Sequence, residues 1–281
     1  MIGFAGARMD TRSKTPDLAA TAGEVIAALA ERRQIQPFSA RPGGLTLADA
    51  GRVQPLLRAA FEARGEKITG RKIGFTNRTM WPKYGVYAPN WGYVTSATTR
   101  DLAKTNALRC ADFLEPLIEP EIMFGLKAAP APDMDENALL DCIDWLSLGY
   151  EVVQSIYPGW KFAPADTTAA NAQHGALLVG ARHAVAPRKA QWLKELAACE
   201  IELLCGGQII LGQASNVLDS PLLALRHLVD MLAKDPHNPP LAAGEIVTTG
   251  SLTLAMPVAP GETWTAMVSG IPLEAVRLRF D

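Results

Sequence analysis

The feature that most constrains this chain is a pair of glutamates inside an apolar stretch, Glu115-Pro-Leu-Ile-Glu119-Pro-Glu121-Ile-Met-Phe. In a β-strand, residues two apart point to the same face, with Cα atoms roughly 7 Å apart. Two carboxylates on one face of an apolar strand repel each other unless positive charge lies between them. A divalent cation is the simplest source of that charge, so the stretch predicts a strand that carries metal ligands.

A third acid, Glu151, lies in a second apolar stretch, Gly149-Tyr-Glu151-Val-Val-Gln-Ser-Ile156. One such glutamate usually marks an edge strand that faces water, but three of them, two on one strand face, favour a metal site. Oxygen-only ligand sets suit Mg²⁺, Mn²⁺ or Ca²⁺ rather than zinc or copper. Three carboxylates leave about three octahedral positions for a chelating substrate and a water.

The composition excludes several other classes of protein. The chain has 281 residues, of which 48% are hydrophobic, enough for a large core in one or two domains. The net charge of -2 and the lack of a long basic run argue against nucleic-acid binding. No apolar run reaches the roughly 18 residues of a membrane span, and the four cysteines form no CxxC pair. We expect a cytoplasmic protein with reduced cysteines and no zinc site.

The hydrophobic pattern divides the chain into a helical region, residues 1–67, and a β-rich region, residues 68–281, which is expected to be the catalytic domain. Alternatively, the two regions form one continuous domain. Helices are expected from about residue 16 to 33 and over 45–67. Thr46 can cap the second helix, and Pro55 is expected to break or delay it. Many short strands and few helices follow. This pattern predicts an α+β protein built around a bent, mixed β-sheet.

Four stretches resemble the 2-keto-4-pentenoate hydratase family, within the fumarylacetoacetate hydrolase superfamily. The order and spacing of the stretches fit the family over roughly residues 20–281. They are Gly70-Arg-Lys72-Ile-Gly74-Phe; Glu119-Pro-Glu121-Ile; Tyr150-Glu151-Val-Val-Gln-Ser with Trp160-Lys161 and Asp166…Asn171; and Gly244-Glu-Ile-Val-Thr-Thr-Gly250-Ser-Leu-Thr253 with Pro257-Val-Ala-Pro-Gly261.

The resemblance implies a bent mixed β-roll, like the C-terminal domain of fumarylacetoacetate hydrolase, with N-terminal helices and homo-oligomeric assembly. It also implies Mg²⁺ or Mn²⁺ held by Glu119, Glu121 and Glu151. The family acts on 2-oxo acids and their enols, often from the breakdown of aromatic compounds. Its members hydrate 2-hydroxy-dienoates, decarboxylate vinylogous oxo acids or cleave C–C bonds.

The resemblance also suggests which groups surround the metal. Lys72 matches a glycine-flanked lysine of the family and can supply positive charge or shuttle a proton, although alone it would be taken for a surface lysine. His174 can act as an acid or base, or serve only the structure. Four further residues are candidates for binding the substrate, or for an ordinary turn in the case of the first three: Gly250, Ser251, Thr253 and Asn171.

The chain departs from the family pattern around the metal. Lys83 stands where many hydratases have an aspartate, and Gln154 and Ala170 replace two further aspartates. Lys83 can meet an acidic substrate group, act as an acid or face solvent. No histidine precedes His174, so the histidine–glutamate pair of the superfamily's hydrolases has no counterpart. The aromatic segment 81–94 is either a lid over the substrate or a packed cover.

These observations favour a metal-dependent lyase that acts on 2-oxo acids or 2-hydroxy-dienoates, hydratase-like, through a metal-stabilised enolate. The candidate catalytic residues are Lys72, Lys83 and His174. One alternative is a decarboxylase of a vinylogous 2-oxo acid on the same scaffold. Another is a non-catalytic homologue that only binds the metal and the oxo acid.

Overall fold

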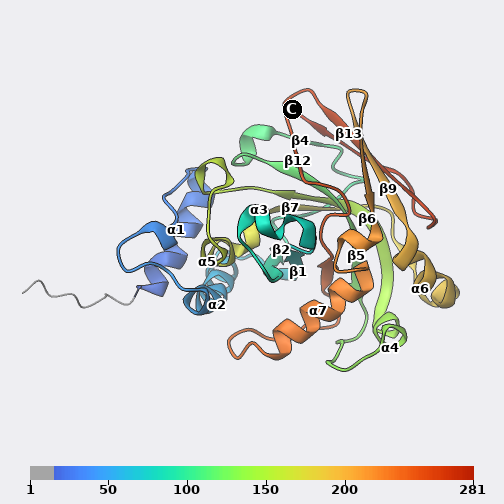
Figure 1. The fold of residues 1–281 in the computed structure, drawn as a ribbon, viewed down its shortest axis with the longest axis horizontal. Coiled ribbons are helices and arrows are strands. Elements are labelled where there is room, and N and C mark those ends of the chain that lie inside the picture. Colours follow the sequence, from blue (N-terminus) through green and yellow to red (C-terminus); the bar gives the residue numbers. More distant parts are fainter. Residues whose placement is uncertain (1–15) are drawn as a thin grey trace, which may run out of the picture.

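The computed structural model describes residues 16–281, so the first fifteen residues of the predicted helical region lie outside it. Figure 1 shows a large curled sheet, a smaller sheet beside it, and two groups of helices around them. The helices are α1 (Leu18–Glu31), α2 (Leu47–Ala63), α3 (Trp81–Tyr84), α4 (Glu136–Asp141), α5 (Pro164–Ala169), α6 (Lys189–Ala198) and α7 (Pro221–Ala233).

The strands of the described chain form two sheets. The larger runs in the order β2 (Asn90–Thr95), β1 (Ile68–Gly74), β11 (Ile246–Thr248), β5 (Leu117–Leu126), β6 (Ile143–Val153), β7 (His174–Val179) and β3 (Thr99–Asp101), with β12 (Met256–Pro257) beside β5 and β8 (His183–Ala184) beside β6. The smaller runs β10 (Gln208–Gln213), β9 (Glu200–Cys205), β13 (Thr263–Ser269), β14 (Val276–Phe280) and β4 (Ala107–Leu108).

Both sheets contain parallel and antiparallel pairs. In the larger sheet β1 pairs in parallel with β11, and β3 with β7, whereas β5 is antiparallel to both β11 and β6. The smaller sheet is antiparallel except for the pair of β14 and β4. The predicted α+β fold with a mixed, curled sheet is therefore confirmed.

The register of β5 and β6 decides where the acids lie. Glu119 stands directly opposite Glu151, and Glu121 stands opposite Gly149. Directly opposed residues share a face of the sheet, and so do residues two apart on one strand. All three carboxylates therefore leave the same face near the centre of the larger sheet.

The N-terminal helices mostly follow their sequence signals. Helix α1 begins at Leu18 rather than Pro16, because the side chain of Asp17 accepts from Ala20 N and caps it. Thr46 caps α2 as predicted, in a reciprocal capping box with Asp49. The expected break at Pro55 is wrong, because α2 continues through it to Ala63.

Burial explains why α2 tolerates its proline. Val53, Leu57 and Phe61 follow one face of the helix, and each is buried in the main hydrophobic core. Tertiary packing of such a face supplies most of a helix's stability and can outweigh one lost backbone hydrogen bond. The same core includes Ile122 and Tyr150 of the central strands, so the helices and the sheet share it.

The helices of residues 16–281 include none with both the length and the apolar character needed to cross a membrane.

Candidate active site

The three predicted acids meet in space. Glu119, Glu121 and Glu151 each offer a carboxylate oxygen, and these oxygens lie within 4.8 Å of one another. Glu121 and Glu151 are fully buried, while Glu119 is partly exposed at the edge of a pocket. The central strands β5 and β6 carry the cluster, so neighbouring strands on both sides hold its backbone in place.

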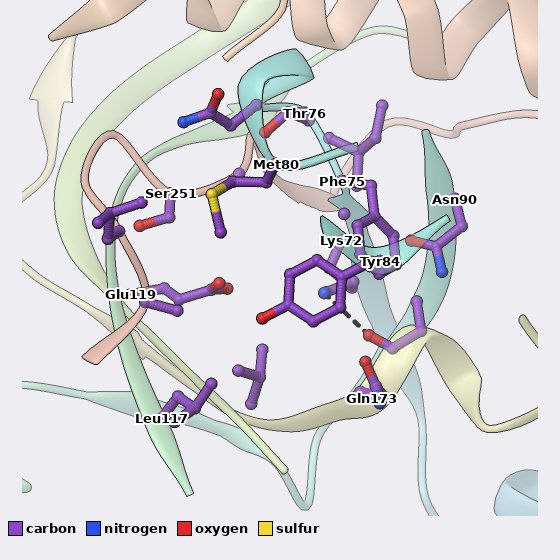
Figure 2. Close-up of a pocket in the computed structure, with 18 of the residues that line it drawn as sticks. Lys72, Phe75, Thr76, Met80, Tyr84, Asn90, Leu117, Glu119, Gln173 and Ser251 are labelled. Carbon is purple, nitrogen blue, oxygen red and sulfur yellow. Dashed lines mark hydrogen bonds between the residues drawn. The ribbon is translucent and has the colours of Figure 1, made fainter. Parts of the chain in front are cut away.

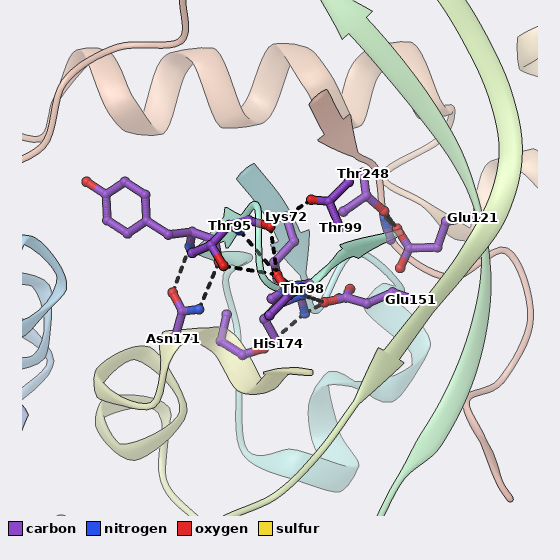
Figure 3. A network of polar contacts seen from close by, with 12 residues as sticks. Lys72, Thr95, Thr98, Thr99, Glu121, Glu151, Asn171, His174 and Thr248 are labelled. Carbon is purple, nitrogen blue, oxygen red and sulfur yellow. Dashed lines mark hydrogen bonds and ion pairs between the residues drawn. The ribbon is translucent and has the colours of Figure 1, made fainter. Parts of the chain in front are cut away.

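The two buried carboxylates differ in how many of their oxygens have partners. Glu121 Oε2 accepts from Gly250 N at 2.8 Å and from the hydroxyl of Thr248. Glu151 Oε1 lies 2.8 Å from His174 Nδ1, and its Oε2 lies 3.3 Å from the Lys72 ammonium. Among residues 16–281, Glu121 Oε1 has no partner, and Glu151 Oε2 has only its ion pair with Lys72 (Figure 3).

The electrostatics show that the site lacks positive charge. Burial, together with the charges of Glu151 and Glu119, raises the pKa of Glu121 well above its usual range. Burial outweighs the nearby Lys72 and raises the pKa of Glu119 to about 7. Burial would also raise the pKa of Glu151, but Lys72 and His174 outweigh it and lower that pKa.

These features fit a hard divalent cation. Buried polar atoms nearly always have a hydrogen-bond partner, and in the described chain neither Glu121 Oε1 nor Glu151 Oε2 accepts a hydrogen bond, although Glu151 Oε2 pairs with Lys72. The donor set is entirely oxygen, which suits Mg²⁺, Mn²⁺ or Ca²⁺. A cation bound by the three glutamates would satisfy the free oxygens and favour the charged form of each acid.

Lys72 is buried beside the acids rather than exposed on the strand surface. Its Nζ donates to Ala172 O at 2.9 Å and pairs with Glu151. Burial would lower the pKa of Lys72, but the three glutamates outweigh it and raise that pKa. Lys72 is therefore held as a cation at the pocket.

His174 contacts the acid cluster through Glu151 and lies outside the pocket. It is 5% exposed, and its two ring nitrogens lie 2.8 Å from Glu151 Oε1 and 2.9 Å from Thr98 Oγ1. Such outer contacts orient a metal-binding carboxylate. Its ring is not among the groups that line the pocket, so the geometry supports a positioning role rather than direct acid–base chemistry.

A pocket of about 190 Å³ opens in front of the acids (Figure 2). Its polar lining includes six of the predicted site residues: Lys72, Lys83, Glu119, Gly250, Ser251 and Thr253. The remaining wall is mainly apolar: Phe75, Met80, Tyr84, Leu117, Val153, Trp160, Phe162, Leu254 and Met256. An apolar pocket with a few polar groups at one end is typical of a small-molecule site.

The structure places the remaining candidates differently. Lys83 lies at the exposed rim, with its Nζ 5.2 Å from the centre of the Tyr84 ring. Asn171 does not line the pocket, because both ends of its amide bind the backbone of Tyr93, at 2.7 Å and 2.9 Å. Its contacts therefore hold a turn and leave no free amide atom for a substrate.

The aromatic segment 81–94 was expected to be either a lid over the substrate or a packed cover. In the structure its two ends differ: one lines the pocket and the other is packed in the core. Tyr84 lines the pocket and stacks on Phe162, with parallel rings 6.0 Å apart. Trp91 and Tyr93 lie in β2 and are buried in the core. The first part is a cover over the pocket, and the second part is packed structure.

Sequence reasoning missed three polar residues near the site, Asn90, Thr167 and Gln173. Asn90 and Gln173 line the pocket, and Thr167 connects them by hydrogen bonds. They come from separate segments and form no motif, so only the folded chain brings them together.

Comparison with curated proteins shows what the chain is similar to. It is 28% identical over 246 residues to 2-hydroxyhexa-2,4-dienoate hydratase of Comamonas testosteroni, which covers 87% of this chain and 90% of that protein. It is 29% identical over 259 residues to 2-keto-4-pentenoate hydratase 1 of Dechloromonas aromatica (strain RCB), covering 90% and 93%. The resemblance to the 2-keto-4-pentenoate hydratase family is confirmed. In a scan against protein-family models, no model matches the chain.

Solved structures show the same relationship. The 4-oxalocrotonate decarboxylase from Pseudomonas putida G7, complexed with magnesium and adipate, superimposes with a TM-score of 0.84 at 28% identity, covering 98% of this chain and 100% of that one. More distant fumarylacetoacetate hydrolase-family structures share the fold, with TM-scores of 0.53 and 0.51. The fold of that decarboxylase therefore extends across nearly the whole of this chain.

Proposed function

We propose that the protein is a metal-dependent lyase of the hydratase type, which adds water to a 2-hydroxy-dienoate or its 2-oxo form. The observation that carries this proposal is the cluster of Glu119, Glu121 and Glu151, in which Glu119 lines one end of a mainly apolar pocket and Glu121 Oε1 has no partner among the described residues. The hydratase relatives, similar over most of their length, support it.

The reaction requires charge stabilisation and proton transfer. For a five-carbon dienoate, the oxygen of water bonds to C4 and gives up one proton, the enol gives up another, and carbons C3 and C5 each gain one proton. A divalent cation held by the three glutamates would stabilise the negative charge that develops on the C2 oxygen. Lys72 donates through Nζ to Ala172 O and pairs with Glu151, so it is the basic side chain beside the acids that can donate toward that oxygen.

Ser251 is the best placed of the predicted substrate-binding groups. Its Oγ is buried and has no hydrogen-bond partner in the described part of the chain, and Ser251 lines the pocket. In contrast, Gly250 N already donates to Glu121 and Thr253 Oγ1 donates to Leu254 O. Ser251 is therefore the hydroxyl free to donate to the substrate carboxylate.

A decarboxylase is the second candidate. The observation that favours it is Lys83, a cation at the pocket rim that can pair with the second carboxylate of a dicarboxylic substrate. The decarboxylase scaffold with a TM-score of 0.84 supports the same alternative.

One assay separates these functions. Purified protein with Mg²⁺ or Mn²⁺ is offered 2-hydroxyhexa-2,4-dienoate and 4-oxalocrotonate, and products are identified by mass. Gain of one water supports the hydratase, whereas release of CO₂ from 4-oxalocrotonate supports the decarboxylase. Metal-dependent binding of both compounds with neither product would support the non-catalytic homologue.

The proposal also covers the metabolic role, the cellular location and the oligomeric state of the protein. Hydration of dienoates suits the catabolism of aromatic compounds in the cytoplasm. Exposed apolar side chains on the outer face of the smaller sheet, Ile209, Leu211 and Met267, support assembly into a homo-oligomer. Light scattering of the purified protein tests the assembly.

A further inference from the structure

A second polar group of the pocket lies away from the acids. Figure 2 shows Ser251 and Glu119 on one side of the pocket, Asn90 and Gln173 on the other, and Lys72 between them. Asn90 is 8% exposed and Gln173 6%, yet Asn90 Oδ1 and Gln173 Nε2 have no hydrogen-bond partner within residues 16–281. Leaving buried amide atoms unpaired is costly, so a pair of them in one pocket points to a ligand.

The opposite ends of the two amides are fixed by a shared hydroxyl. Asn90 Nδ2 donates to Thr167 Oγ1 at 3.1 Å, and Thr167 Oγ1 donates to Gln173 Oε1 at 3.3 Å. This chain of bonds uses one end of each amide. It leaves one acceptor, Asn90 Oδ1, and one donor, Gln173 Nε2.

The backbone that presents Gln173 is strained. Asn171, Ala172 and Gln173 have consecutive positive φ angles of 54°, 49° and 62°, which are uncommon for residues other than glycine. The turn is held by Lys72 Nζ on Ala172 O and by the amide of Asn171 on Tyr93. Strained backbone persists where surrounding contacts over-determine it, and it is concentrated at functional sites.

Gly74 keeps space open beside this pair. A methyl group built on Gly74 would lie 2.6 Å from Asn90 Oδ1 and 3.1 Å from Lys72 Nζ. The absent side chain therefore keeps the space beside both atoms free of protein atoms from this position, where Asn90 Oδ1 lies near the ammonium.

We propose that Asn90 and Gln173 form a specificity site for an uncharged hydroxyl group on the substrate chain, the group that hydration creates at C4. A hydroxyl both donates and accepts, so one oxygen can satisfy Asn90 Oδ1 and Gln173 Nε2 together. A carboxylate only accepts and would be repelled by Oδ1. This inference rests on the proposed function.

The test compares 2-oxopentanoate with each enantiomer of 4-hydroxy-2-oxopentanoate, which differs from it only in that hydroxyl. Their affinities for the Mg²⁺-loaded protein are measured by calorimetry. We expect the wild type to bind one hydroxy acid about tenfold more tightly, the size of one or two hydrogen bonds. Asn90→Leu and Gln173→Met should abolish this preference and retain binding of 2-oxopentanoate.

Two further variants guard against general damage. Asn238→Leu removes a buried amide outside the pocket, whose Oδ1 accepts from Tyr93 Oη, and should keep the preference. Gly74→Ala deletes no hydrogen-bonding group but crowds Asn90 Oδ1, and should lose the preference even if Asn90→Leu does not fold.

The outcomes separate this inference from the proposed function. Equal binding of the two ligands by the wild type, or a preference that survives in the Asn90, Gln173 and Gly74 variants, overturns the hydroxyl site alone. Absence of Mg²⁺-dependent binding of 2-oxopentanoate by the wild type overturns the proposed function together with it.

Discussion

The acid cluster and the aromatic cover line the same pocket but are built in opposite ways. Glu119, Glu121 and Glu151 project from two central strands, where ladder hydrogen bonds fix each backbone position. Tyr84 and Phe162 come from a four-residue helix and a loop, and they are held by contacts between rings. The pocket thus has a rigid charged end and a more adaptable apolar end.

The difference follows from what each end must do. Carboxylates that share a cation must stay close despite their mutual repulsion, so their supports have to be stiff. An apolar wall only has to exclude water and match a shape, which loosely supported rings can do. Substitutions at the charged end should therefore reduce cation binding and activity much more than substitutions at the cover.

The largest effect is expected for Glu121→Gln. The amide keeps the acceptor for Gly250 N but removes a charge, so cation binding and lyase activity should be lost. At 100 times the dissociation constant, Mg²⁺ should raise the melting temperature of the wild type by about 5 °C. The variant should show almost no rise.

Melting curves with Mg²⁺ and with a chelator check this prediction. Without metal, Glu121→Gln should be at least as stable as the wild type, because the neutral amide avoids the cost of ionising a buried acid beside Glu119 and Glu151. If Mg²⁺ raised the melting temperature of the variant as much as that of the wild type, Glu121 would not be a metal ligand.

A smaller effect is expected for His174→Leu. The ring orients Glu151 but does not line the pocket, so its loss should weaken Mg²⁺ binding by about 10–100-fold. At saturating Mg²⁺, kcat should largely recover. If activity stayed absent at saturation, His174 would instead take part in the chemistry.

Replacing an aromatic side chain of the cover should impair the enzyme less than replacing His174. Tyr84→Leu keeps an apolar surface but loses the stacking on Phe162, which is worth about 0.5–1.5 kcal/mol. We expect KM to rise by about threefold to tenfold, with Mg²⁺ affinity unchanged. A loss of Mg²⁺ binding in this variant would show that the two ends are not independent.

The smallest effect on a monocarboxylic dienoate is expected for Lys83→Met. Lys83 is exposed at the rim, where an ion pair is worth about 0–1 kcal/mol. Steady-state kinetics should show less than about a threefold change with a monocarboxylate. A selective rise in KM for 4-oxalocrotonate would instead favour the decarboxylase.

Local sequence signals predicted more of the charged end than of the cover. Glu119 and Glu121 share a strand face by alternation alone, and Thr46 was correctly predicted to cap α2. The break expected at Pro55 failed because burial of the helix face outweighed the lost hydrogen bond. For segment 81–94, composition could not separate the part that packs in the core from the part that covers the pocket.

The sequence by itself determined the ligand chemistry of the site, because residue type and spacing within one strand decide which charges share a face. Only the tertiary structure decided which groups surround those charges. It places Glu151 opposite Glu119 and Lys72 beside them, turns His174 toward Glu151, and joins Asn90 to Gln173 through Thr167. These pairings depend on sheet register and on a strained turn, which are set by long-range packing rather than by neighbouring residues.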